Sequence, residues 1–337
     1  MKLENANSFI ERGNPPPANA GFLGVDLDFS DASVVAIPVP WDVTTSYGKG
    51  TSKGPQAIIS ASHQMDAEDS YFGKIYRAGI SFLEVSKAIE DLNKVTSTIP
   101  RENITKINQA CAEVNKYVYE EAQKILAQKK LPCVVGGDHA APFGLIQALA
   151  ENYADGFSIV HLDAHHDLRD AYEGFEHSHA SIHYNTMTQL PQIKFLTQVG
   201  IRDYSSTEKE FMIALAKQKR GACFYSRELF ARQASGVSFE KICDDIFSTI
   251  PTENIYISFD IDALDPSYCP STGTPVPGGW SFEQACYFLE KISRLGKNII
   301  GFDLCEVAPG PTEWDANVGA RLFYKLCGTL LRSHKKV

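Results

Sequence analysis

The run HLDAHHDLRD, directly after the apolar segment FSIV, places Asp163, His165 and Asp167 two residues apart. Residues i, i+2 and i+4 of a β-strand point to one face, so two carboxylates and an imidazole converge there. Ionised carboxylates that lie so close repel one another unless a cation lies between them. The triplet therefore predicts a divalent-metal site at a strand end, rather than a solvated end that is merely rich in polar residues.

Two further segments carry side chains of the metal-ligand type after an apolar strand pattern. The segment IYISFDIDALDP contains Asp260 and Asp262, and LPCVVGGDHAAPFG contains His139. In open parallel α/β sheets, sites form just beyond the carboxyl ends of the strands, where these segments can meet. Four carboxylates and two imidazoles are too many for one ion but suit two bridged ions, roughly 3.5–4 Å apart. The six predicted ligands are His139, Asp163, His165, Asp167, Asp260 and Asp262.

The pattern along the chain predicts an α/β protein. Short apolar segments typical of strands cover residues 33–40, 131–137, 157–163, 194–201, 221–226, 254–262 and 298–307. Apolar periodicity predicts helices over residues 56–66, 105–126, 143–152, 207–219, 238–247, 281–292 and 315–331. Thr207 with Glu210, and Ser281 with Gln284, fit capping boxes at two helix starts. This alternation predicts a three-layer α/β/α fold around a central, mainly parallel sheet.

Composition permits one large domain and argues against some partners. The chain has 337 residues, of which 44% are hydrophobic, and a net charge of −9, which argues against nucleic-acid binding. The run NPPPANAG predicts that residues 1–33 form an irregular extension, which leaves residues 34–337 as a single domain. The sequence shows neither an apolar run long enough for a membrane helix nor a secretory h-region. Eight scattered cysteines without a CxxC pair suggest free thiols, so we expect a cytoplasmic protein without a membrane partner.

The motifs GGDH, DAHHD and SFDIDALDP, in this order, resemble the three metal signatures of the ureohydrolase (arginase/agmatinase) family. The resemblance covers about residues 35–331 and implies an arginase-like fold, two manganese ions and a homo-oligomer, commonly a trimer or hexamer. It also implies two bridging ligands, Asp163 and Asp260, with His139 and Asp167 completing one site and His165 and Asp262 the other. A ligand set rich in carboxylates suits Mn²⁺ better than thiolate-preferring ions, with Ni²⁺ as the main alternative.

The same resemblance implies roles in catalysis. Two bridged cations can lower the pKa of a shared water until hydroxide exists near neutral pH, and Asp167 would orient that hydroxide. Glu306, in GFDLCEVAP, matches the glutamate that grips the guanidinium in this family, because a carboxylate accepts two parallel N–H bonds. His179, in EHSHASIH, matches the loop histidine that passes a proton to the departing amine, with His177 and His183 as alternatives. Strand alternation points His166 away from the ions.

The residues expected at the substrate tail argue against arginine. Arg169 stands where arginases carry an asparagine, and Ser205, two residues after Asp203, stands where they carry an acidic residue. Formiminoglutamase-like members also have an arginine at this place, and a guanidinium pairs well with a substrate carboxylate. The alternative interpretation of Arg169 is a salt bridge to Asp170 or Glu173.

Trp280, in TGTPVPGGW, stands where many relatives have a leucine. We hypothesise that its ring narrows the pocket and covers a cation, which would favour a short substrate such as free guanidine. The alternative is that Trp280 belongs to the core. Trp314, in PGPTEWDAN, is a second predicted wall of the pocket.

Three functions fit these patterns. The first is a binuclear-metal hydrolase that releases urea from a guanidino compound, agmatine-like or as small as guanidine, rather than from arginine. The second is a formiminoglutamase-like or guanidino-acid hydrolase that uses Arg169 to hold a carboxylate. The third, from another class, is a non-catalytic regulatory relative, which would be expected to lack some metal ligands.

Overall fold

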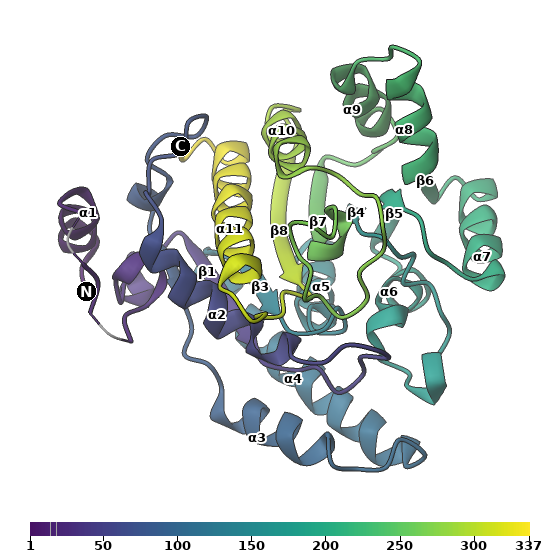
Figure 1. Ribbon diagram of the computed structural model, residues 1–337, viewed down its shortest axis with the longest axis horizontal. Helices are drawn as coiled ribbons and strands as arrows, with labels where there is room; N and C mark the ends of the chain where they lie inside the picture. The colour runs from purple at the N-terminus through teal and green to yellow at the C-terminus, as the bar shows by residue number, and fades with distance from the viewer. Residues whose placement is uncertain (14, 18) are drawn as a thin grey trace.

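One parallel sheet organises the chain, whose structure is a computed structural model that describes residues 1–13, 15–17 and 19–337. Within these residues the eight strands pair in parallel in the order β2-β1-β3-β8-β7-β4-β5-β6 (Figure 1). The strands are β1 Val34–Val39, β2 Ile80–Phe82, β3 Leu131–Gly136, β4 Phe157–Leu162, β5 Ile193–Ile201, β6 Gly221–Tyr225, β7 Asn254–Asp260 and β8 Asn298–Cys305. The prediction of a mainly parallel sheet is confirmed.

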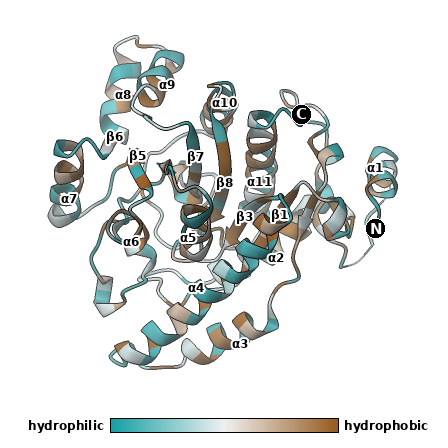
Figure 2. Ribbon diagram, turned by 180° about the vertical axis from the view of Figure 1, so that it is seen from behind, coloured by the Kyte–Doolittle hydropathy of each residue, from teal (hydrophilic) through white to brown (hydrophobic). Residues whose placement is uncertain are grey.

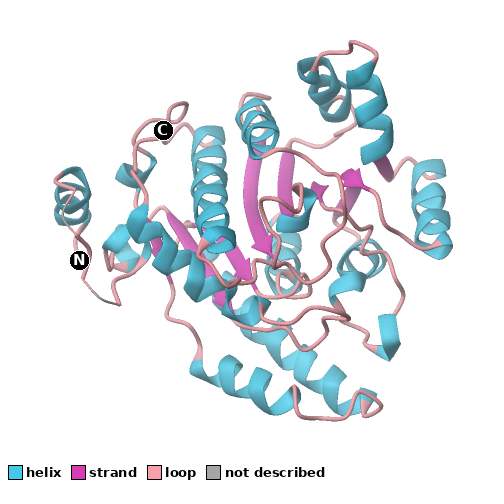
Figure 3. Ribbon diagram, viewed as in Figure 1, coloured by secondary structure: helices cyan, strands magenta, loops and turns pink. Residues whose placement is uncertain are grey.

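Helices cover both faces of the sheet, as the ribbon coloured by secondary structure shows (Figure 3). The α-helices are α1 Leu3–Glu11, α2 Gly54–Ala61, α3 Lys87–Thr96, α4 Ile104–Ala127, α5 Phe143–Asn152, α6 Ile182–Gln189, α7 Ser206–Lys217, α8 Ser226–Ala234, α9 Phe239–Phe247, α10 Phe282–Ile292 and α11 Trp314–Ser333. Side chains of α2, α9, α10 and α11 pack on one face, and those of α4, α5, α6 and α7 on the other. The predicted three-layer α/β/α architecture is therefore present.

The central strands are apolar on both faces because both faces are covered. In β1, Val34 and Ala36 pack into one core cluster, whereas Val35 and Ile37 pack into the other. All four are fully buried, which explains the continuous apolar runs of the sequence. The ribbon coloured by hydropathy shows a hydrophobic stretch along β8 as well (Figure 2). Among the described residues, no helix is both long and apolar enough to cross a membrane.

The N-terminal segment is more regular than the sequence predicts. Leu3–Glu11 forms helix α1, in which Ala6 is buried and Phe9 packs against the core. Glu11 at its end is held by Lys74 and Arg77. The prolines that suggested an irregular segment follow this helix, and residues 14 and 18 of that run lie outside the described part of the chain.

One predicted capping box is wrong and the other is confirmed. The N-cap of α7 lies two residues earlier than predicted, because Ser205 accepts a hydrogen bond from the Glu208 amide and Glu208 accepts one from the Ser205 amide. Thr207 lies inside the first turn instead. Ser281 and Gln284 form the predicted box at the start of α10. Helices α3, α6 and α8 and the short strand β2 were not predicted.

Replacing the cap residue of α7 should destabilise the protein. We expect Ser205→Ala to lower the free energy of unfolding by about 1 kcal/mol, because an orphan helix N–H loses its acceptor. The measurement is the shift of the urea unfolding midpoint. Thr207→Ala is the matched control, and an equal loss in both variants would contradict the assignment.

Candidate metal centre

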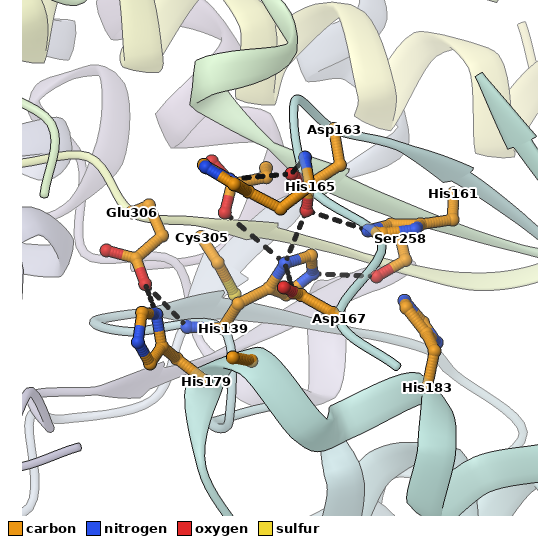
Figure 4. Close-up of polar contacts among 12 residues, drawn as sticks. His139, His161, Asp163, His165, Asp167, His179, His183, Ser258, Cys305 and Glu306 are labelled. Carbon is orange, nitrogen blue, oxygen red and sulfur yellow. Dashed lines mark hydrogen bonds and ion pairs between the residues drawn. The ribbon is translucent and has the colours of Figure 1, made fainter. Parts of the chain in front are cut away.

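All six predicted ligands converge where β3, β4 and β7 end, in the part of the sheet ordered β3-β8-β7-β4. Figure 4 shows four of them, His139, Asp163, His165 and Asp167, lying together. Asp163 directly follows β4, and Asp260 is the last residue of β7. His139 follows β3 through a glycine turn that passes close to the Trp41 backbone. A Cβ on Gly137 would lie 1.9 Å from the Trp41 carbonyl oxygen, so only glycine fits this turn.

One group of ligands surrounds His139. Its Nδ1 lies 3.2 Å from Asp163 Oδ2, 3.1 Å from Asp167 Oδ2 and 3.3 Å from Asp260 Oδ2. A second group surrounds His165, whose Nδ1 lies 3.0 Å from Asp262 Oδ2 and 3.4 Å from Asp163 Oδ1. The two oxygens of Asp163 thus face one imidazole each, so this carboxylate lies between the two groups.

The spacing and electrostatics of these groups fit metal ions. Ligand atoms about 2.1 Å from one ion and at right angles to each other lie about 3 Å apart, close to the distances found here. Burial, and then the neighbouring carboxylates of Asp262 and Asp163, raise the pKa of Asp260 well above its usual range. Asp262 Oδ2 is buried without a hydrogen-bond partner. A cation would relieve both the repulsion and the missing contact, so the residues present fit two divalent ions.

Two site residues have a strained backbone. Asp167 and Glu306 have φ angles of 52° and 62°, in the left-handed region that non-glycine residues seldom adopt. The Asp167 carbonyl accepts hydrogen bonds from two amides of α6, and the Glu306 amide donates to the Gly137 carbonyl at 2.8 Å. Strain of this kind is kept where the surroundings hold a functional side chain in place. Side-chain pattern alone does not reveal it.

The structure adds polar residues that the sequence analysis missed around His139. Its Nε2 lies 2.9 Å from Ser258 Oγ, which in turn lies 3.2 Å from Asp303 Oδ1. His161 Nε2 lies 2.8 Å from Asp163 Oδ2. Such outer contacts orient metal ligands and fix their tautomers. His161 could have been found from sequence, because it lies two residues before Asp163 and shares its strand face.

His166 is turned away from the ligands, as predicted. It is fully buried, and its Nδ1 lies 2.6 Å from Gln198 Oε1. Its ring packs against Tyr204 and Tyr225. The alternation of the strand therefore separates the two adjacent histidines of DAHHD.

Glu306 and His179 lie together beside the ligand groups (Figure 4). Glu306 Oε1 accepts a hydrogen bond of 3.0 Å from the His139 amide and lies 3.6 Å from His179 Nδ1. Glu306 Oε2 and His179 Nε2 are buried and have no hydrogen-bond partner. Burial alone would lower the pKa of His179, but the carboxylates of Glu306, Asp138 and Asp167 together outweigh it and raise that pKa above its usual value.

The loop histidine is held by a contact that spans distant parts of the chain. The His179 amide donates to Thr44 Oγ1 at 3.0 Å, and Thr44 Oγ1 donates to Asp138 Oδ2 at 2.7 Å. Burial raises the pKa of Asp138 to about 7. The other two histidines of the segment lie elsewhere, with His177 against Phe143 and His183 against His161.

A cavity of about 220 Å³ opens beside the ligands. Its lining includes metal-centre residues, acidic and basic side chains and two tyrosines, namely Ser46, His165, Asp167, Arg169, Tyr172, His179, Ala180, Asp203, Tyr204, Ser205, Glu208, Asp260 and Thr274. The predicted substrate residues Arg169 and Asp203 therefore face this cavity. Glu208, buried at the start of α7, is a further carboxylate there that the sequence analysis missed.

The predicted salt bridge from Arg169 to Asp170 or Glu173 is wrong. Its Nε lies 3.4 Å from Glu208 Oε2, and its guanidinium lies over the Tyr172 ring at 4.5 Å. Glu173 pairs with Arg101 instead. The reason is that Ala171 and Glu173 have positive φ angles, so the chain turns Glu173 away from Arg169.

Trp280 does not line the cavity beside the ligands within the described residues, so the structure gives no support to the hypothesis that it covers a substrate cation. Its side chain is 6% exposed, packs against Phe239 and Phe288 and lines a different cavity. The preceding Gly278 and Gly279, with φ angles of 93° and 106°, turn the chain so that the ring enters the core. Trp314 is not a wall of the ligand cavity either within the described residues, since it is 45% exposed and donates through Nε1 to the Ser267 carbonyl.

Comparison with known proteins identifies the family. A family model described as the arginase family matches residues 32–328. An N(1)-aminopropylagmatine ureohydrolase of Thermus thermophilus is 32% identical over 304 residues, which cover 90% of this chain and 92% of the relative. An agmatinase of Cronobacter sakazakii is 28% identical over 300 residues, covering 88% of this chain and 87% of the relative.

Solved structures agree with this assignment. A crystal structure described as a hypothetical agmatinase from Burkholderia thailandensis has a TM-score of 0.73 and 26% identity, with 96% of this chain and 94% of the other covered. The chain belongs to the arginase, or ureohydrolase, family. It is a hydrolase that acts on carbon–nitrogen bonds, and the non-catalytic alternative is not retained.

Because Trp280 lies in the core, we expect its replacement to lower stability without changing substrate specificity. We expect Trp280→Leu to lower the free energy of unfolding by about 2 kcal/mol, because it leaves a cavity between two phenylalanine rings. Relative rates of urea release from different guanidino compounds should stay the same. Trp314→Leu, at an exposed site, should change stability by at most about 0.5 kcal/mol. A changed substrate order in Trp280→Leu would refute the core assignment.

Proposed function

We propose that the chain hydrolyses a guanidino compound with a cationic tail to urea and an amine, at two divalent ions held by the six ligands. The observation that carries this proposal is the pair of unpartnered buried atoms, Glu306 Oε2 and His179 Nε2, beside the ligand groups. A buried carboxylate oxygen without a donor is costly, so the site is complementary to a ligand that brings N–H groups.

A guanidinium supplies the missing donors. Glu306 accepts its N–H bonds at Oε2 and so holds the substrate carbon beside Asp167 and Asp163. The ring of His179, whose pKa is raised by Glu306, carries a proton at Nε2 and donates it to the nitrogen that leaves as the amine. The charge on Glu306 thus both orients the substrate and keeps the proton donor charged.

The ions that fit are Mn²⁺ first and Ni²⁺ second, because four of the six ligands are carboxylates. When bound, such a pair supplies Lewis acidity and lowers the pKa of a shared water. Asp167, which faces both the cavity and His139, would help to hold an ion and would accept a hydrogen bond from the attacking water, orienting it toward the substrate carbon.

The cavity supports an agmatine-like substrate in preference to free guanidine. Asp203 and Glu208 line it and provide carboxylates for an amine on the tail. Two of the relatives reported above are named after agmatine or its aminopropyl derivative, which carry such tails. A tail amine would compete with Arg169 for Glu208. The free-guanidine alternative loses its main support, because Trp280 lies in the core.

A guanidino acid is the second candidate substrate. The observation that favours it is the placement of Arg169, which is stacked on Tyr172 in the same cavity. A substrate carboxylate would pair with its guanidinium.

We also propose a cytoplasmic location, supported by the eight free cysteines, and a homo-oligomer, either a trimer or a hexamer.

Metal content tests the ligand assignment. We expect the wild-type protein, dialysed against Mn²⁺, to hold two ions per chain, and His165→Asn to hold one, because only the second group loses its imidazole. Asp163→Asn should weaken both ions, since its oxygens face both groups. The readout is manganese per chain after removal of free metal. Two tightly held ions in Asp163→Asn would contradict a bridging role.

Urea release tests the function. The Mn²⁺-loaded enzyme is assayed with agmatine, N(1)-aminopropylagmatine, guanidinobutyrate, guanidine and arginine, and we expect the cationic-tail compounds to react fastest. Glu306→Gln should lower kcat/KM roughly 100-fold or more, since a buried charge pair with the guanidinium is lost. His177→Asn, on the same segment but outside the cavity, is the control. Activity only on guanidinobutyrate would favour the second candidate, and no urea from any compound would refute the proposal.

A further inference from the structure

A buried network of hydrogen bonds leads from the metal centre to side chains that do not line the substrate cavity within the described residues. It begins at Asp163, passes through His161 and Gln198, and ends at His166 beside Tyr225. His161, His166 and Gln198 have no exposed surface. None of them lines the cavity within the described residues, so the proposed chemistry leaves them without a role.

The proton positions in this hydrogen-bond network follow from one backbone carbonyl. The His166 carbonyl oxygen can only accept, so the Gln198 atom 2.7 Å from it must be the amide nitrogen Nε2. The same nitrogen lies 2.9 Å from His161 Nδ1 and donates its second hydrogen there. The other amide atom, Oε1, accepts from His166 Nδ1 at 2.6 Å. The orientation of the Gln198 amide is therefore determined.

The tautomer of His161 follows from this orientation of the Gln198 amide. Because Nδ1 accepts from Gln198, the hydrogen of the neutral ring is on Nε2, which lies 2.8 Å from Asp163 Oδ2. His183 packs against the His161 ring with centroids 4.1 Å apart and keeps it in place. Asp163 Oδ2 thus receives a directed N–H from His161 and also lies 3.2 Å from His139 Nδ1, which Asp167 and Asp260 contact as well.

We infer that Gln198 and His161 are positioning residues that fix the orientation of the Asp163 carboxylate, so that each of its oxygens faces one of the two ions. The N–H of His161 occupies one lone pair of Oδ2 and leaves the other for the ion beside His139. A carboxylate free to rotate could instead give both oxygens to one ion. The inference rests on the proposed function, because it requires ions at Asp163.

Two substitutions of His161 separate this role from simple packing. The amide of glutamine reaches the position of Nε2 and can donate to Asp163, whereas the amide of asparagine reaches only the position of Nδ1, toward Gln198. With Mn²⁺ as the probe, we expect His161→Gln to bind two ions nearly as tightly as wild type. His161→Asn should lose about 10- to 100-fold in Mn²⁺ affinity, the usual effect of removing an outer contact of a ligand.

The readouts are equilibrium dialysis with Mn²⁺ and the EPR spectrum, in which a coupled ion pair differs from isolated ions. Melting temperatures of the metal-free variants are the folding control, since a purely structural role would affect the two variants alike without a change in ion pairing. Equal Mn²⁺ affinity and equal spectra in His161→Asn and wild type would overturn the inference. If the wild type itself bound fewer than two ions, the proposed function would fail instead.

The tautomer can also be observed directly. In metal-free protein labelled with ¹⁵N-histidine, the His161 signals are those lost in His161→Gln, and the chain has nine histidines in all. We expect a protonated Nε2 and an unprotonated Nδ1. In Gln198→Met, which lacks the amide, the two nitrogens should give averaged signals. A protonated Nδ1 in the wild type, or an unchanged spectrum in Gln198→Met, would refute the role of Gln198.

Discussion

Repulsion among buried carboxylates is the constraint on which the rest of this structure depends. Four aspartates and two imidazoles lie within hydrogen-bonding distance of one another at the centre of the sheet. Burial raises the pKa of Asp260 and Asp167, so these groups are stable as anions only with compensating positive charge. A flexible framework would let them separate. The covered parallel sheet, the glycine turn at Gly137 and the strained backbone of Asp167 prevent that.

Sheet topology gathers these residues. Strands β3, β8, β7 and β4 are neighbours although they lie far apart in the sequence, and each ends in residues of the site. Because all four run in the same direction, their carboxyl ends share one edge. The candidate metal centre is thereby built from strand ends. Arg169, Asp203 and Glu208, which line the cavity beside it, lie instead on loops and at a helix start.

Neighbouring polar residues hold the predicted ligands and His179 in place through hydrogen bonds. Ser258 and Asp303 support His139, Gln198 and His161 support Asp163, and Thr44 supports His179. Apart from the contact between His161 and Asp163, which lie at the end of the same strand, these contacts join residues from different strands or loops. Glu208 takes part in several contacts at once. Its carboxylate caps α7, pairs with Arg169 and faces the cavity.

The sequence by itself determined the fold class and the residues that meet at the candidate metal centre. Strand periodicity is local, so the face shared by Asp163, His165 and Asp167 can be read directly, and three such strand ends require a common edge. It did not determine the partner of Arg169, the place of Trp280 or the roles of His161 and Gln198. These depend on contacts between distant segments and on backbone turns at Ala171, Gly278 and Gly279, which only the tertiary structure decides. The neighbours of a side chain are set by packing in three dimensions, which the periodicity of the sequence does not encode.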